Sequence, residues 1–223
     1  MFKSELELEI KFIEQLNKFK TDNEHIIQQF NARFGNVDVI KVIMNNPLNV
    51  SASQAEILSI HANAMVVAFL HKKQSRTLNY LIKKTGYTKE YLLNIISNLK
   101  KEKIIVEINS QKFIISEDFK FPKLKFNAYE LKLKDWKKAI NQAVKNTNFA
   151  YASFVVMPDK EAIKINNKYS NIFSNYNIGL IGVNDNSFIT YIRPKNEIQS
   201  YFVNPILISS IAKYSLLTKE QPA

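Results

Sequence analysis

The sequence predicts an α/β protein that is interrupted by a basic, mainly helical module. After residue 123, apolar strand-like runs alternate with helical patterns, which is typical of a sheet covered by helices. A helical pattern followed by two strand-like runs occupies residues 2–44. Between these parts, helical patterns precede a hairpin pattern, which is the order of a winged helix-turn-helix. We therefore expect residues 1–47 and 123–223 to form a discontinuous α/β core and residues 48–122 to form an inserted domain.

The first part begins with a helical pattern. Apolar residues recur at helical spacing over residues 2–20. Strands are expected over His25–Phe34 and Val37–Met44, because a tight turn at Gly35-Asn36 separates the two apolar runs. Pro47 then disfavours continuation of any regular element.

The basic module shows clear helix boundaries. Thr88 is a candidate N-cap, and Gly86 stands where a helix needs a left-handed residue after its last turn. Two apolar runs joined by Asn109-Ser110-Gln111 predict a hairpin. The expected elements are helices over Ser53–Leu70, Arg76–Lys84 and Lys89–Lys101 and strands over Ile104–Ile108 and Lys112–Ser116.

The last part continues the α/β pattern. Asp135 is the expected cap of its first helix. The expected strands are Lys123–Leu133, Tyr151–Met157, Ile178–Val183 and Phe188–Ile192, and the expected helices are Trp136–Asn146, Lys160–Lys168 and Pro205–Leu217.

Composition restricts the function classes. The absence of cysteine excludes disulfide frameworks, thiolate zinc sites and cysteine nucleophiles. The N-terminus is unlike a secretory signal, and the longest apolar stretch, near residues 62–70, is too short to span a bilayer. We expect a cytoplasmic protein with no membrane partner. The net charge of +11, from 31 Lys and Arg against 20 Asp and Glu, favours a polyanionic partner, although a Lys-rich and Asn-rich composition also arises from an AT-rich genome.

Charged residues interrupt two of the apolar strand patterns. Asp38 lies in the Val37–Met44 pattern, and Glu130 and Lys132 lie in the Lys123–Leu133 pattern. Because residues two apart in a strand share a face, Glu130 and Lys132 are expected to point the same way. Burying such charges is costly without a partner or a metal. Two carboxylates can hold Mg²⁺ or Mn²⁺, and a nearby ammonium can position a water against a phosphodiester.

The order of these residues resembles the PD-(D/E)xK nuclease superfamily. The similarity extends over residues 1–47 and 123–193, and it includes Gly35-Asn36-Val37-Asp38, Glu130-x-Lys132, and the helix that opens at Asp135-Trp136 and carries Gln142. The resemblance implies an α/β fold with a restriction-endonuclease-like mixed sheet flanked by helices. It also implies that Asp38 and Glu130 bind Mg²⁺ (or Mn²⁺) and that Lys132 positions the attacking water.

The chain also departs from the family pattern. Val37 stands where the family has proline, and the segment from Asp38 to Glu130 is unusually long, which an insertion explains. Auxiliary roles implied by the resemblance fall on Gln142 and on Glu5 of the first helix. Gln142 could equally be a partly exposed helix residue, and Glu5 could belong to a solvated acidic face.

The inserted module is the expected DNA reader. Nine Lys and Arg fall between residues 72 and 103, and their phosphate contacts would give salt-dependent affinity. The third helix of the module would enter the major groove, and the loop of the hairpin would contact phosphate or the minor groove. The candidate DNA-binding residues are Lys83, Lys84, Thr88, Lys89, Tyr91, Asn94 and Lys112.

These observations predict a Mg²⁺-dependent DNA endonuclease, with restriction or defence as a role by analogy. A homodimer would suit double-strand cleavage of a symmetric site. Three alternatives remain open for the residues. Glu130 and Lys132 could form a solvent-facing stripe on an edge strand, and Asp38 could serve only to form the hairpin near the Gly35-Asn36 turn. The winged helix could bind a protein instead of DNA. At the level of function, the alternative is a catalytically inactive DNA-binding transcriptional regulator on a nuclease-like fold.

Overall fold

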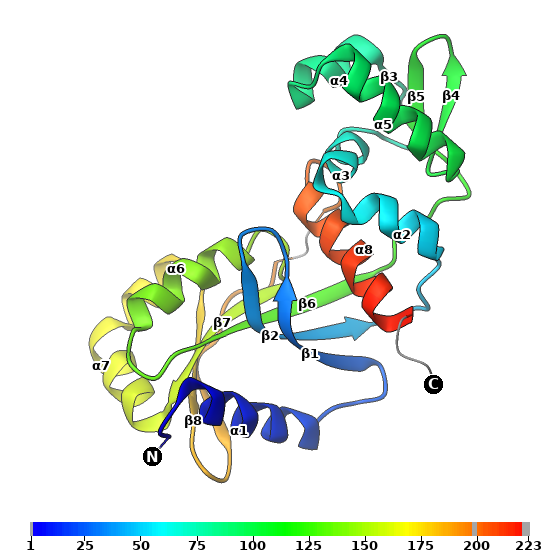
Figure 1. Ribbon diagram of the computed structural model, residues 1–223. Helices are drawn as coiled ribbons and strands as arrows, with labels where there is room; N and C mark the ends of the chain where they lie inside the picture. Colours follow the sequence, from blue (N-terminus) through cyan, green and yellow to red (C-terminus); the bar gives the residue numbers. More distant parts are fainter. Residues whose placement is uncertain (1, 198–199, 220–223) are drawn as a thin grey trace. The chain divides into compact units, whose positions relative to one another are not determined.

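The computed structural model describes residues 2–197 and 200–219, which fall into two compact units (Figure 1). Unit 1 comprises residues 2–45 and 124–197, and unit 2 comprises residues 46–123 and 200–219. The chain therefore leaves unit 1 after residue 45 and returns to it at residue 124, within two residues of the boundaries expected from the sequence. In the described part of the chain, no helix has the length and apolar character needed to cross a membrane.

Unit 1 is an α/β unit with a mixed six-stranded sheet flanked by helices, as expected for the fold class. The strand order is β1-β2-β6-β7-β8-β9. β2 pairs antiparallel with β1 and β6, the β6–β7 and β7–β8 pairs are parallel, and β9 returns antiparallel to β8. The elements are α1 (Glu5–Lys18), β1 (Glu24–Asn31), β2 (Asn36–Met44), β6 (Leu124–Leu131), α6 (Trp136–Asn146), β7 (Ala152–Pro158), α7 (Asp159–Asn175), β8 (Gly179–Val183) and β9 (Phe188–Ile192).

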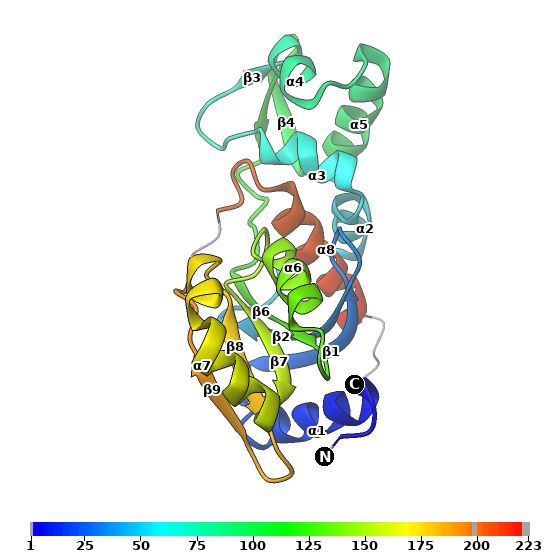
Figure 2. The same cartoon turned by 90° about the vertical axis from the view of Figure 1, so that its left-hand side faces the viewer.

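Helices cover both faces of this sheet (Figure 2). On one face, the apolar side of α1, which includes Leu8 and Phe12, packs against Tyr129 and Leu131 of β6. On the opposite face, α6 and α7 pack against β7 and β8. Because side chains alternate along a strand, Glu130 of β6 lies on the α6 side, between two residues that face α1. This alternation decides which helix each charged residue of β6 can reach.

Unit 2 contains a helical group and a small sheet. Its elements are α2 (Ala52–Ser59), α3 (His61–Ala68), β3 (Arg76–Thr77), α4 (Leu78–Thr85), α5 (Lys89–Lys101), β4 (Ile105–Asn109), β5 (Lys112–Ile115) and α8 (Pro205–Lys219). The three strands form an antiparallel sheet in the order β3-β5-β4. The helix–helix–hairpin order of α4, α5, β4 and β5 is the one expected from the sequence.

The turns around α4 and α5 follow the expected chemistry. Gly86 ends α4 with a left-handed φ of 72° and donates its N–H to the carbonyl of Ile82. The Thr88 hydroxyl accepts the Tyr91 N–H at 3.3 Å and caps α5. α4 itself begins two residues later than expected, because Arg76 and Thr77 pair with β5 instead of forming its first turn.

The expected single helix over Ser53–Leu70 is wrong. The backbone breaks at Ile60, whose ψ of 117° is extended, so that α2 ends and α3 begins there. The Asn63 side chain donates to the carbonyl oxygen of Ile57 at 2.8 Å and so satisfies an acceptor at the end of α2. Apolar periodicity alone does not reveal this break, because α2 and α3 contribute to one core.

The placement of the C-terminal helix also differs from the expectation. The sequence assigned residues 123–223 to the α/β core, but α8 belongs to unit 2. Ile208 and Ala212 are buried in the core that α2 and α3 form, and the Val203 N–H donates to the carbonyl of Ala68 at 2.8 Å. An apolar pattern shows that α8 is buried but does not show which core it joins.

Candidate functional site

Asp38 lies near the start of β2, and its carboxylate faces the end of β6. The pairing of Val39 with Tyr129 brings this part of β2 alongside the last residues of β6. Oδ2 of Asp38 accepts a hydrogen bond from the backbone N–H of Leu131 at 2.8 Å. On the other side of β2, the pairing with β1 is interrupted at Gln29, whose φ of 51° lies in the left-handed region. Asp38 therefore occupies an irregular point of the sheet, where its carboxylate is held by a backbone donor.

Lys132 lies one residue beyond the end of β6. Its ammonium donates to Glu5 Oε2 at 3.1 Å and to the carbonyl oxygen of Leu131 at 2.7 Å, and it lies 3.7 Å from Asp38 Oδ2. Burial alone would lower the pKa of Lys132, but the Asp38 and Glu5 carboxylates outweigh this effect, and the pKa is raised. The ammonium is therefore charged and sits between two carboxylates.

The expected geometry of Lys132 is corrected in one respect. The sequence placed Lys132 inside a strand, on the same face as Glu130. β6 ends at Leu131, although the Lys132 N–H still donates to the carbonyl of Val156 on β7 at 3.1 Å, and the Lys132 ammonium reaches Glu5 of α1. Glu130 instead contacts α6. Glu5, which was an auxiliary candidate, is thus a direct partner of Lys132.

Glu130 is buried almost completely, with 1% of its surface exposed. Oε1 accepts a hydrogen bond from Asn146 Nδ2 at 2.7 Å, whereas the buried Oε2 has no hydrogen-bond partner among the described residues. Burial raises the pKa of Glu130 to about 7, and the nearby Asp38 carboxylate contributes to the rise, while Asn146 and Lys132 oppose the shift. Glu130 is therefore a carboxylate that ionises near neutral pH and keeps one oxygen uncommitted. The solvent-facing stripe that the sequence left open for Glu130 and Lys132 does not occur, since both residues are buried.

α6 supplies the hydrogen-bond partner of Glu130. Asn146, on its last turn, holds Oε1 of Glu130, and sequence reasoning missed it. Gln142 lies one turn earlier on the same helix face, and its Oε1 is buried without a hydrogen-bond partner. The sequence does carry a signal for Asn146: two amide residues, Gln142 and Asn146, stand four positions apart in the helix that follows Glu130.

The donor atoms at this site are compatible with a hard divalent cation. Among the described residues, no group of three or more His, Cys, Asp or Glu side chains is arranged to hold a metal ion. Mg²⁺, however, is commonly held by one or two carboxylates, with water and phosphate oxygens completing its shell. The uncommitted Oε2 of Glu130 and the repulsion between Asp38 and Glu130 are the features that a bound cation would relieve. Asp38 and Glu130 therefore fit such an ion.

The candidate DNA-binding residues lie on unit 2, and all of them are exposed. They occupy α4 (Lys83, Lys84), α5 with its cap (Thr88, Lys89, Tyr91, Asn94) and β5 (Lys112). The Thr88 hydroxyl already accepts a backbone N–H, so only its remaining hydrogen-bonding capacity is left for a ligand. Lys84 Nζ lies 6.0 Å from the ring centre of Tyr80, close to the outer limit of a cation–π contact.

Comparison with known proteins finds no matching family model, no matching curated protein and no matching solved structure.

Proposed function

We propose that this chain is a Mg²⁺-dependent DNA endonuclease, with a restriction-endonuclease-like unit 1 and a winged helix-turn-helix in unit 2. The observation that carries the proposal is the juxtaposition of Asp38, Glu130 and Lys132 where β2 and β6 meet, although 91 residues separate Asp38 from Glu130 in the sequence. A buried carboxylate with an uncommitted oxygen beside a second carboxylate and an ammonium is costly for the fold. Functional sites are where such groups are typically retained.

The side chains would divide the work in a definite way. Asp38 and Glu130 would hold Mg²⁺ or Mn²⁺, which lowers the pKa of a bound water and neutralises charge on the phosphate. Lys132, a positively charged group with three N–H donors, would orient the attacking water and stabilise the negative charge that develops on the phosphate. Glu5 keeps the Lys132 ammonium in place. Asn146 fixes the orientation of the Glu130 carboxylate.

Unit 2 would deliver the DNA. Lys83, Lys84 and Lys89 are exposed cations on two adjacent helices, and such residues neutralise phosphates in a salt-dependent way. Tyr91 and Asn94 are exposed on α5, where they would face base edges if this helix entered the major groove. Sequence preference would then come from α5 and general affinity from the lysines.

Cleavage of supercoiled plasmid tests this proposal. Purified protein should convert it to nicked or linear forms with Mg²⁺ or Mn²⁺ and not with EDTA. Asp38→Asn and Glu130→Gln should both remove this activity, and combining them should add little, because groups that act as a unit are not additive. Asp185→Asn, which changes an exposed carboxylate of unit 1, is the matched control and should cut normally. Wild-type protein that cuts no substrate, or an Asp38→Asn variant that cuts normally, contradicts the proposal.

The second candidate function is a DNA-binding regulator without catalytic activity. Its supporting observations are that Lys132 already contacts two carboxylates of the protein and that Glu130 is only 1% exposed, which leaves little access for a metal or a substrate. DNA binding that is unaffected by metal, together with absence of nicking, would favour this candidate.

A further inference from the structure

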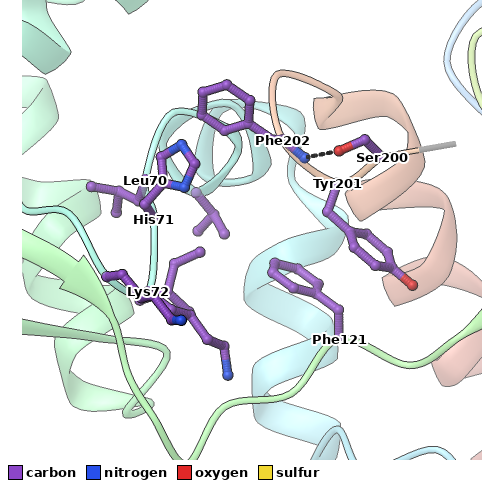
Figure 3. A pocket seen from close by; sticks show the side chains of 10 residues that line it. Leu70, His71, Lys72, Phe121, Ser200, Tyr201 and Phe202 are labelled. Carbon is purple, nitrogen blue, oxygen red and sulfur yellow. Dashed lines mark hydrogen bonds between the residues drawn. The ribbon is translucent and has the colours of Figure 1, made fainter.

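Unit 2 contains a cavity of about 410 Å³ that no part of the proposed cleavage site uses. It lies between the segment after α3, the segment after β5 and the segment that precedes α8 (Figure 3). These contribute His71 to Lys73, Phe121, and Ser200 to Phe202. A volume of this size is in the range of small-molecule sites.

Aromatic rings form much of the wall. Phe202 lies over His71, with ring centres 4.2 Å apart, and Phe121 stacks on Tyr201 at 4.6 Å with an angle of 12° between the planes. The Tyr201 hydroxyl donates to the carbonyl of Pro122, which fixes the ring. Phe202 is 41% exposed, so part of its ring surface is open to a ligand. The cavity therefore offers rigid, apolar ring faces to a planar ligand.

Two cations accompany these rings. Lys72 donates from Nζ to the backbone carbonyls of Phe119 and Glu117, which hold the ammonium in place without neutralising it. The adjacent Lys73 is exposed. Within the described part of the chain, neither lysine takes part in an ion pair. A ligand of the cavity therefore meets uncompensated positive charge.

The backbone that presents Phe202 is strained. Val203, the next residue, has a φ of 58°, which is unfavourable for a β-branched side chain. Its N–H donates to the carbonyl of Ala68 at 2.8 Å, and the Phe202 N–H donates to Ser200 Oγ at 3.2 Å. Strain of this kind persists only where the surroundings enforce it, and it concentrates at ligand-binding sites.

We propose that this cavity binds a nucleotide, with its base stacked on the aromatic side chains and its phosphate beside Lys72 and Lys73. A nucleotide combines the two properties that the wall selects, a planar ring system and a negative charge. A free nucleotide and an unpaired nucleotide within DNA share this chemistry. The inference goes beyond DNA cleavage, because the cavity shares no residue with Asp38, Glu130 or Lys132.

The first experiment is calorimetric titration of the full chain with deoxyadenosine 5′-monophosphate in the presence of EDTA. We expect binding, and we expect deoxyadenosine and inorganic phosphate each to bind at least about tenfold more weakly, because each lacks one of the two recognised parts. Phe202→Ala and Lys73→Ala should each weaken the binding of the mononucleotide by about tenfold. Both side chains are exposed enough to be replaced without loss of the fold, which a thermal melt verifies. Lys168→Ala, an exposed lysine of unit 1, is the matched control and should bind normally.

The second experiment distinguishes the source of the nucleotide. Two DNA duplexes, one fully paired and one with a single unpaired adenosine, compete with the mononucleotide. If the duplex with the unpaired adenosine displaces the mononucleotide more strongly than the fully paired duplex, the natural ligand of the cavity is an unpaired base of DNA. If the two duplexes displace the mononucleotide equally, the natural ligand is a free nucleotide. The proposal is overturned if millimolar mononucleotide gives no binding and the unpaired duplex is not preferred, or if Phe202→Ala and Lys73→Ala both bind like the wild type. Because the titration contains no divalent metal, its failure is distinguishable from failure of the cleavage proposal.

Discussion

Replacing Glu130 with Gln should change how the stability of unit 1 depends on pH. The pKa of Glu130 is raised from its ordinary value of 4.5 to about 7, because burial disfavours the charged form and Asp38 repels it. Between these two values the folded state binds more protons than the unfolded state. The free energy of unfolding therefore falls as pH rises through this window.

The magnitude follows from the two pKa values. Each pKa unit corresponds to about 1.4 kcal/mol, so a rise from 4.5 to about 7 amounts to about 3 kcal/mol. This stabilisation is fully present below about pH 4.5 and is lost once the pH exceeds about 7. The glutamine side chain of the variant cannot ionise, so the stability of the variant lacks this fall. The variant also buries an amide N–H in place of Oε2, which shifts its stability by a constant amount and leaves the pH dependence unaffected.

Urea unfolding followed by tryptophan fluorescence measures the effect. Trp136 is the single tryptophan and lies in α6, so its signal reports unit 1. The difference in unfolding free energy between Glu130→Gln and wild type should move in favour of the variant by about 3 kcal/mol between about pH 4.5 and pH 8. Asp185→Asn, which replaces an exposed carboxylate on the same unit, should follow the wild type. Parallel curves for Glu130→Gln and wild type would refute the reasoning, because they would mean that Glu130 does not titrate differently in the two states.

Three further outcomes are expected. Lys132→Ala should reduce plasmid nicking by about 100-fold or more while DNA binding measured by anisotropy persists, because it removes a transition-state contact and no metal ligand; normal cutting would exclude this role. Mg²⁺ should raise the melting temperature of the wild type and not that of Asp38→Asn, since binding to the folded state stabilises it; equal stabilisation of both would place the ion elsewhere. Replacing Lys83, Lys84 and Lys89 with Ala should lower the salt slope of DNA affinity by about 0.9 for each phosphate that is no longer neutralised, and an unchanged slope would remove this surface from the interface.

Local signals in the sequence predicted local structure well. The left-handed Gly86 and the Thr88 cap depend on residues close in the chain, and both occur where expected. The expected turn at Gly35-Asn36 is displaced: β1 already ends at Asn31, which pairs with Asn36 of β2, so the connection is formed by residues 32–35. The interruption of the α/β part by a separate unit was also predictable, because the element pattern changes on both sides of it.

The predictions failed where distant contacts decide the outcome. The extended residue Ile60 splits a continuous helical pattern into α2 and α3. The Asn63 side chain donates to the carbonyl of Ile57 and so gives an acceptor at the end of α2 a hydrogen-bond partner, which a local pattern does not predict. The strand expected over Lys123–Leu133 ends two residues early, at Leu131, and the Lys132 ammonium meets Glu5 of α1, which the sequence pattern does not place within reach. Apolar periodicity specifies that a face is buried. It does not specify the partner or the residue at which a strand stops.

The hydrogen bond from Asn146 satisfies only one of the two oxygens of Glu130. A buried glutamate could be stabilised fully if donors satisfied both oxygens, and a carboxylate that accepts several hydrogen bonds has a lowered pKa. Here a single amide holds Oε1, and Oε2 has no hydrogen-bond partner among the described residues. The neighbouring Asp38 carboxylate adds repulsion instead of relief. The site thus leaves one buried carboxylate oxygen without a donor among the described residues, and a cation bound as proposed would supply a partner for it.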